Sequence, residues 1–598
     1  MDHPPPDVTL GAPRVRLSRD DNFRPQRDAP GAAFLFVGGA CGSALLFSRG
    51  AVGAALAFLL TGLLVACGGG GGDAPPTSAL PDLPARKASA ATPVAAGCTG
   101  GSVSGSVYAN AEVEPFVAAH PTNPNHLLGA WQQDRWSNGG ARALVSAVSL
   151  DGGATWARTL HPMSRCGGAA ASSAGDFERA TDPWVDIGPD GTAYAMGLAF
   201  NGGALLPGST SAMLASRSTD GGLTWSAPTV LVRDGSSLFN DKNTITADPT
   251  DARLVYAVWD RIDAAGHGPA LIARSTDSGA TWEPAREFYV PSRAGAGTTV
   301  SQTIGNRIVV IPAGPERGTL VNVFNQIDSV NGTSVSRVAV MRSADKGLTW
   351  SAPVYVSELR AVGARDPATG QRIRDGAVIP VAAAGPDGAL WLAWQDARFS
   401  GGQVDAIALA RSGDAGLTWS APVAVNRISA VHAFTPTLHV RADGLVGLMH
   451  YDLRSNSDDV STLLADAWLL SSRDGITWAE TRVHGPFDLA AAPDAGGLFL
   501  GDYHGLVSAG TSFLPLLVLS STDTGNRTDV YAPRLDGIAA GREQPLAAGG
   551  THRARAATRG VPGGLSATQF RTARSDAIAA AMEQRVPGWH QRVQGRER

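Results

Sequence analysis

An eight-residue motif, Ser-x-Asp-x-Gly-x-Thr-Trp, constrains the fold of this chain more than any other feature. It occurs five times without a gap, with its Trp at positions 156, 225, 282, 350 and 419, and a sixth copy ending at position 478 is one residue short. Successive copies lie 57 to 69 residues apart. This spacing predicts one supersecondary unit repeated along a single domain, each unit long enough for four short strands.

The motif lies between two apolar segments, such as residues 212–215 and 228–232, and is therefore expected to be the turn of a β-hairpin. Its Asp can accept hydrogen bonds from free backbone amides, its Gly can adopt a positive φ, and its Trp can pack against the sheet. We predict that the motif stabilises the fold and lies outside the functional site. The residues given this structural role are Asp151, Trp156, Asp220, Trp225, Asp277, Trp282, Asp345, Trp350, Asp414, Trp419, Asp474 and Trp478.

A second pattern precedes the motif in each unit: a short strand, a turn and a longer alternating strand, as in residues 182–200 and 376–396. Each unit thus contains four antiparallel strands, and such units repeated around a ring form a β-propeller, an all-β fold. Units that begin near residues 114, 182, 241, 306, 376, 435 and 502 predict seven four-stranded blades, with six as the alternative. Because the last unit has three strands, we expect an N-terminal segment, residues 101–110, to complete it and close the ring.

Over residues 98–537 these repeats resemble the sialidase-like family of Asp-box, or BNR, repeat proteins. The resemblance implies a β-propeller with its ligand on the face opposite the repeat turns. The family includes propellers that hydrolyse glycans and propellers that do not. The Phe-Arg-Ile-Pro sequence that sialidases carry before the first blade is missing, since residues 111–121 read AEVEPFVAAHP.

Strand order indicates which rim carries the ligand. In an antiparallel unit the repeat turns lie on one rim, so the ends of second strands and the starts of first strands lie on the other. Converging guanidinium groups at that rim can hold a carboxylate through paired hydrogen bonds, but recurring Asp–Arg pairs are also what ion pairs between blades produce. Both interpretations stay open. The candidate substrate-binding residues are Arg135, Arg261, Arg307, Arg398, Arg454, Asp396 and Asp502.

The resemblance also implies candidate catalytic residues. Sialidases hold the substrate carboxylate with three arginines and use a Tyr nucleophile, an assisting Glu and an Asp acid/base. Carried over by position, Arg261, Arg307, Arg398 and Arg454 compete for the arginines, Tyr503 or Tyr451 for the nucleophile, Glu178 for its partner, and Asp134 or Asp241 for the acid/base. We predict a propeller that recognises glycan. The alternatives are an active glycoside hydrolase of the exo-α-sialidase type and a protein-interaction scaffold without catalysis.

The N-terminal part of the chain indicates export. Residues 50–66 are apolar, and residues 64–67, Leu-Val-Ala-Cys, resemble the lipobox of a bacterial lipoprotein signal, with Cys67 as the lipidation site; a transmembrane anchor is the alternative. We divide the chain into an extension with the signal (1–66), a flexible tether (67–97), the propeller (98–540) and a basic tail (541–598). Cys98 and Cys166 are expected to form a disulfide in an oxidising compartment, with two buried thiols as the alternative.

Charge and composition add three expectations about partners. A formal net charge of -4 argues against wholesale nucleic-acid binding. We expect a monomer that contacts glycan through the propeller and a membrane, in the periplasm or at the cell surface, through the lipid anchor. The sequence contains no zinc motif and implies no cofactor, and the segment with Asp458 and Asp459 is either a solvated loop or a calcium site.

Overall fold

The computed structural model describes residues 86–101, 104–291, 299–330 and 333–538, and these residues form almost exclusively antiparallel β-structure. Helical structure within these ranges is limited to three short 3-10 turns, η1 (Arg165–Gly167), η2 (Ala397–Ser400) and η3 (Leu489–Ala491). The described part of the chain contains no helix long and apolar enough to cross a membrane. The predicted signal, the lipidation site Cys67 and the basic tail lie outside the described residues.

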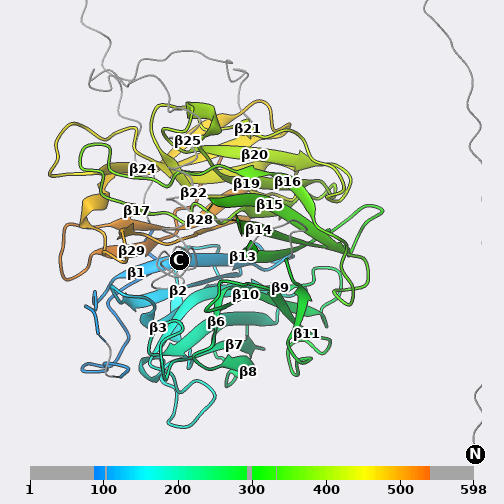
Figure 1. The fold of residues 1–598 in the computed structure, drawn as a ribbon, viewed down its shortest axis with the longest axis vertical. Helices are drawn as coiled ribbons and strands as arrows, with labels where there is room; N and C mark the ends of the chain where they lie inside the picture. Colours follow the sequence, from blue (N-terminus) through cyan, green and yellow to red (C-terminus); the bar gives the residue numbers. More distant parts are fainter. Residues whose placement is uncertain (1–85, 102–103, 292–298, 331–332, 539–598) are drawn as a thin grey trace, which may run out of the picture. The chain divides into compact units, whose positions relative to one another are not determined.

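Consecutive strands form groups in which neighbours pair antiparallel (Figure 1). The first group is β1 (Glu112–Ala119), β2 (Leu127–Arg135), β3 (Ala141–Ser149) and β4 (Ala157–Leu160), and the second is β5 (Arg179–Ile187), β6 (Ala193–Asn201), β7 (Thr210–Ser218) and β8 (Thr229–Asp234). The third is β9 (Leu238–Ala247), β10 (Val255–Asp263), β11 (Ala270–Ser275) and β12 (Arg286–Tyr289), and the fourth is β13 (Thr299–Val310), β14 (Leu320–Val330), β15 (Thr333–Ser343) and β16 (Val354–Leu359).

The remaining groups continue the same pattern. The fifth is β18 (Val381–Ala384), β19 (Leu390–Asp396), β20 (Ala406–Ser412) and β21 (Val423–Ala424), and the sixth is β22 (Ala433–Val440), β23 (Val446–Asp452), β24 (Leu464–Ser472) and β25 (Ala479–Asp488). The last group has three strands, β27 (Gly505–Ala509), β28 (Ser512–Ser520) and β29 (Thr528–Tyr531). Two short strands, β17 (Ile373–Arg374) and β26 (Leu498–Phe499), form a separate parallel pair.

The first strands of successive groups contact one another. Such contacts run from β1 to β5, β9, β13, β18, β22 and β27, and β27 contacts β1, so the series returns to its start. In Figure 1, β1 and β29 lie side by side although they are far apart in the sequence. Four-stranded antiparallel groups therefore agree with the predicted repeat, whereas the number of blades stays a prediction.

The repeat turn joins strands 3 and 4 of a group, as predicted, and its side chains hold it closed. In the second group, Asp220 accepts hydrogen bonds from Ser218 Oγ (2.6 Å) and from Thr224 N (2.9 Å) and Oγ1 (2.6 Å). These bonds lower the pKa of Asp220 to about 2. Trp225 reaches the neighbouring group, where its indole N–H donates to Ser146 Oγ at 3.0 Å. The turn thus stabilises its own hairpin and the contact with the group before it.

The N-terminal segment that completes the last group differs from the prediction. Residues 86–89, not 101–110, pair with β29, through an antiparallel bridge between Lys87 and Tyr531 and a hydrogen bond from Ala88 N to Val530 O (2.9 Å). Residue Val107, from the predicted segment, instead bridges Trp136 at the end of β2. The prediction was wrong because it rested only on the need for an N-terminal strand beside the last unit, and that need does not determine which segment fills the place. Polar contacts with Asp529, from Lys87 (2.5 Å) and Ser89 Oγ (3.0 Å), hold the closing segment.

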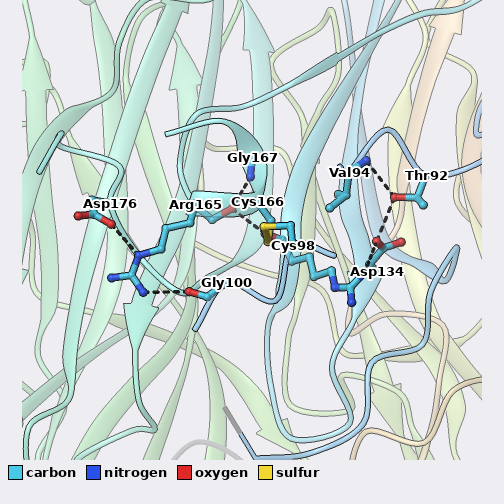
Figure 2. The surroundings of a disulfide bond; sticks show 11 residues. Thr92, Val94, Cys98, Gly100, Asp134, Arg165, Cys166, Gly167 and Asp176 are labelled. Atoms are coloured by element: carbon cyan, nitrogen blue, oxygen red, sulfur yellow. Dashed lines mark hydrogen bonds and ion pairs between the residues drawn. A yellow bond between two sulfur atoms is a disulfide. The ribbon is translucent and has the colours of Figure 1, made fainter. Parts of the chain in front are cut away.

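A disulfide fastens the same N-terminal segment to the first group (Figure 2). Cys98 is bonded to Cys166 in η1, 68 residues later, with a Cα–Cα distance of 5.7 Å. Between the two attachments, Thr92 Oγ1 donates to Asp134 at 3.0 Å. Residues 86–98, which we call the N-terminal strap, therefore connect the last group of strands to the first.

Candidate functional site

A bulge at the same place in the first strands aims polar side chains toward the centre of the ring. The pairing of β1, β5, β9, β13 and β22 with their neighbours shifts register there. At the bulge Glu114, Asp182, Lys242 and Thr435 have φ values of 52°, 53°, 49° and 48°, conformations that are uncommon outside glycine. A bulge turns a side chain away from the regular alternation of a strand, and such features are frequent beside functional sites.

Lys242 is the centre of a buried charged cluster. Its ammonium lies 2.6 Å from Asp502 Oδ2, 3.4 Å from Glu114 Oε1 and 3.7 Å from Asp182 Oδ1. Arg374 adds a second cation, which donates to both oxygens of Asp502 at 3.0 and 2.7 Å. We call these five residues the lysine cluster; they come from the first three groups of strands, from β17 and, for Asp502, from the connection between β26 and β27.

The cluster contains one carboxyl group more than its two cations neutralise. Burial raises the pKa of Glu114 to about 8, and the Lys242 ammonium offsets only part of this shift. Burial would also raise the pKa of Asp502, but Arg374 and Lys242 outweigh it and hold that pKa well below its usual range. At neutral pH the surplus proton therefore lies on Glu114, while Asp502 is ionised.

A pocket lies beside the cluster and is lined by residues of the first four groups, by the connection between β16 and β18, and by Asp502 from the connection between β26 and β27. Its cationic lining residues are Arg135, Lys242, Arg365, Arg372 and Arg374, and its apolar ones include Leu198, Phe200, Phe239, Ile304 and Ile379. Asp182, Asp241 and Asp502 also line it. Because it is lined by starts of first strands and by the end of β2, the pocket lies on the rim opposite the repeat turns.

The four pocket arginines fall into two kinds. Arg374 is bound to Asp502 and lies over the Phe499 ring at 4.4 Å, and Arg135 lies over the same ring at 4.8 Å while it donates to Gln132 at 2.7 Å. Arg365 is exposed and Arg372 is half-buried, and neither guanidinium makes a hydrogen bond or ion pair with any described residue. Two guanidinium groups in the pocket are thus available to a ligand.

Neither candidate nucleophile lines the pocket. Tyr503 lies close to the lysine cluster, but its hydroxyl donates to Pro183 O at 3.2 Å and its ring packs against Trp184. Tyr451 is in the apolar core, where its hydroxyl donates to Val518 O at 2.9 Å. Burial raises the pKa of Tyr503 well above the ordinary value, and that of Tyr451 is raised as well.

The remaining candidate catalytic carboxylates occupy different places. Asp241 lines the pocket beside Lys242. Asp134 instead accepts hydrogen bonds from Thr92 Oγ1 (3.0 Å) and Asn110 N (2.9 Å), and so it holds the N-terminal strap. Glu178 accepts from Gly202 N at 2.8 Å, at the start of the loop between β6 and β7, and is absent from the pocket lining.

Four candidate substrate-binding arginines lie outside the pocket and have partners of their own. Their contacts are Arg261 with Asp234 (3.1 Å), Arg398 with Asp396 (2.7 Å), Arg454 with Asp452 (2.6 Å) and Glu480 (2.8 Å), and Arg307 with the rings of Phe116 and Trp184. Arg398 and Arg454 pair with carboxylates of their own group of strands, and only the Arg261–Asp234 pair joins two groups, as the second interpretation of the Asp–Arg pattern describes. Arg135 and Asp502 are the candidates for substrate binding that do line the pocket.

Sequence reasoning missed Glu114, Arg365 and Arg372 as site residues, although the sequence contains a signal for each. Residues 114, 182 and 435 each precede a proline near the start of a first strand, and this repeated X-Pro step coincides with the bulge. Arg365 and Arg372 belong to an arginine-rich connection between β16 and β18.

The described ranges contain no group of three or more His, Cys, Asp or Glu residues placed to hold a metal ion. At the segment considered for calcium, Asp459 accepts hydrogen bonds from Ser461 N (2.9 Å) and Oγ (2.7 Å).

No protein-family model and no curated protein matches this chain. Among solved structures the chain is similar to the Hadza microbial sialidase Hz136, with 16% identity and a TM-score of 0.40 over 70% of this chain and 75% of that one. It is also similar to an α-L-arabinanase of Penicillium chrysogenum complexed with arabinobiose (14%, TM-score 0.37, 60% and 94%) and to a sialidase of Trypanosoma rangeli (15%, TM-score 0.35, 61% and 54%).

Proposed function

We propose that this chain recognises a glycan that carries a carboxylate, and that the pocket beside the lysine cluster is the binding site. The observation that carries the proposal is the pair of guanidinium groups, Arg365 and Arg372, that line the pocket without partners among the described residues. A planar guanidinium binds a carboxylate through two parallel hydrogen bonds, so two such groups in one pocket favour an anionic ligand.

The other walls of the pocket suit the rest of a sugar. The carboxylates of Asp182 and Asp241 provide acceptors for hydroxyl groups, and Phe200 and Phe239 provide an apolar surface for the ring face or a substituent. A concave site with a few polar groups and an apolar wall is the usual form of a small-ligand site.

Recognition is a better interpretation than hydrolysis by a tyrosine nucleophile. A nucleophile must reach the reacting carbon, but neither Tyr503 nor Tyr451 lines the pocket and both hydroxyls donate to backbone carbonyls. Burial also raises the pKa of both phenols, which disfavours the phenolate. The exo-sialidase alternative therefore has no support from the geometry of these two residues.

We further propose that the protein is an exported, seven-bladed propeller anchored in a membrane through Cys67. The Cys98–Cys166 disulfide supports export, because structural disulfides form and persist in oxidising compartments. Incorporation of a labelled fatty acid into the wild-type chain, and its loss in Cys67→Ser, is the test of the anchor.

Binding of two acidic sugars, N-acetylneuraminic acid and glucuronic acid, tests the function, with glucose as the neutral counterpart of glucuronic acid. We expect saturation-transfer NMR to detect at least one acidic sugar and not glucose. Arg372→Met should weaken binding about tenfold or more, because it removes a charge-assisted hydrogen-bond donor. The control is Arg253→Met, because this arginine lies on the turn between β9 and β10 and its side chain is 74% exposed. Equal binding of glucose and glucuronic acid would refute the proposal, and turnover of a fluorogenic sialoside would support the hydrolase instead.

A further inference from the structure

The connection between β16 and β18 begins with residues 360–375, which we call the arginine loop. This loop includes β17 and carries Arg365, Arg372 and Arg374. Residues 362–365 of this loop form one wall of the pocket. The backbone of Arg365 bridges that of Arg372, and β17 pairs with β26, but the backbone amides of residues 362–364 have no strand partner and need other acceptors.

Two buried carboxylates supply those acceptors. Asp405 accepts from Val362 N through Oδ1 (2.9 Å) and from Gly363 N through Oδ2 (2.8 Å). Asp375 Oδ2 accepts from Ala364 N at 2.6 Å. Three successive amides, immediately before Arg365, are therefore held by two side chains.

Gln395 of β19 joins the two carboxylates. Its Nε2 donates to Asp375 Oδ2 (2.9 Å) and to Asp405 Oδ2 (3.3 Å), and its Oε1 accepts from Thr435 N of β22 at 3.0 Å. Asp405 is 0% and Asp375 is 2% exposed. The pair thus attaches the arginine loop to the fifth and sixth groups of strands, away from solvent.

We propose that Asp375 and Asp405 are positioning residues that set the affinity of the pocket for its anionic ligand, by holding the amides of residues 362–364 so that Arg365 faces the pocket. The part of the inference that concerns ligand affinity rests on the proposed function. The part that concerns the fixed backbone of the loop rests on the hydrogen bonds alone. Asp405 does not line the pocket and acts through the backbone that carries the arginine, whereas Asp375 lines the pocket and holds the same backbone through Ala364 N.

The contacts of Asp405 make its hydrogen bonds to the amides of residues 362 and 363 dependent on pH. Burial, and then the charge of Asp375, raises the pKa of Asp405 to about 8. A proton on either Asp405 oxygen would face N–H donors, because its hydrogen-bond partners are Val362 N, Gly363 N and Gln395 Nε2. Ligand affinity should therefore rise as Asp405 ionises, between about pH 7 and pH 9.

Other titratable and charged groups lie near Asp405. Burial, and then Arg365, lowers the pKa of His432, whose Nδ1 accepts from Asp405 N, to about 4, so this ring stays neutral. Asp396 is paired with Arg398. Burial also raises the pKa of Asp375, so the two carboxylates titrate as a pair that shares the Gln395 amide.

The decisive variant is Asp405→Asn, which keeps the shape of the side chain but replaces one acceptor by a donor. Its control is Asp488→Asn, since Asp488 also accepts from two backbone amides, Leu463 N (2.9 Å) and Ala490 N (3.0 Å), remote from the pocket. The affinity for N-acetylneuraminic acid and glucuronic acid is measured by NMR titration from pH 6 to pH 9. Hydrogen exchange of the amides of residues 362–364 is measured in parallel at one pH.

We expect Asp405→Asn to weaken binding about tenfold or more at pH 9, where the wild-type carboxylate is ionised, and to remove the pH dependence. Exchange at residues 362–364 should rise in this variant and not in Asp488→Asn. An unchanged affinity, or the same loss in the control, would overturn the inference. If Asp405→Asn does not fold, the same two measurements on Asp375→Asn decide.

Failure of the proposed function has a different signature. If the wild-type chain binds neither acidic sugar, the proposed function fails whatever the variant does. Exchange at residues 362–364 then decides whether the two carboxylates hold the loop: faster exchange in Asp405→Asn supports this part of the inference, and unchanged exchange overturns it.

Discussion

Replacement of Lys242 by methionine is the sharpest test of how the ring of first strands is held together. The Lys242 side chain is 9% exposed, and those of Glu114, Asp182 and Asp502 are 1%, 5% and 7% exposed. Methionine retains most of the aliphatic stem but leaves Asp182 without its cation and Asp502 with Arg374 alone. Removal of one partner from a buried ion pair costs about 3–5 kcal/mol, so we expect a loss of that size in the free energy of unfolding.

Chemical denaturation at pH 7, followed by tryptophan fluorescence, measures this loss as a lower midpoint with an unchanged slope. The loss should shrink as the pH is lowered, because protonated carboxyl groups no longer need the cation. Arg253→Met, which removes a cation 74% exposed, should leave the denaturation midpoint almost unchanged. A loss below about 1 kcal/mol for Lys242→Met would refute the view that the buried charges depend on this ammonium.

Three further predictions follow from the titration of single groups and from the strap. Because burial raises the pKa of Glu114 to about 8, folding binds a proton there, and its contribution to stability falls as the pH rises from about 4.5 to 8; denaturation at pH 5 and pH 8 should show a weaker pH dependence in Glu114→Gln. Joint replacement of Cys98 and Cys166 by alanine should cost about 2–4 kcal/mol, measured by thermal denaturation, since the bond closes a loop across 68 residues. Asp220→Ala should cost about 1 kcal/mol or less, because the carboxylate is exposed, and that loss should vanish as the pH falls from about 4 toward 2, with glycan binding unchanged.

The parts of the fold that could be predicted are those whose contacts are local in sequence. The bonds that Asp220 makes in the repeat turn join residues at most four apart, as between Ser218, Asp220 and Thr224, so the motif contains the turn that it forms. The closing strand depends instead on Lys87 and Ser89 meeting Asp529 from the other end of the propeller. No periodicity within residues 86–110 contains that information.

The site was less predictable for the same reason. Arg398 and Asp396 are two residues apart, as are Arg454 and Asp452, and each guanidinium folds back on its near neighbour. The sequence pattern that predicts arginines converging on a ligand is therefore also the pattern of arginines that pair with an aspartate two residues away. The two pocket arginines without partners among the described residues, Arg365 and Arg372, instead come from a connecting loop. The repeat determines neither the length nor the conformation of this loop.

The lysine cluster also explains why only part of the cationic wall is available to a ligand. Asp502 occupies the guanidinium of Arg374 through two bonds and the ammonium of Lys242 through a third, so an incoming anion would have to displace a buried carboxylate to reach either. Such displacement would leave Asp502 as a buried charge without a partner, which is energetically unfavourable. The cations that hold the lysine cluster together are therefore distinct from Arg365 and Arg372, the arginines that we propose bind the ligand carboxylate.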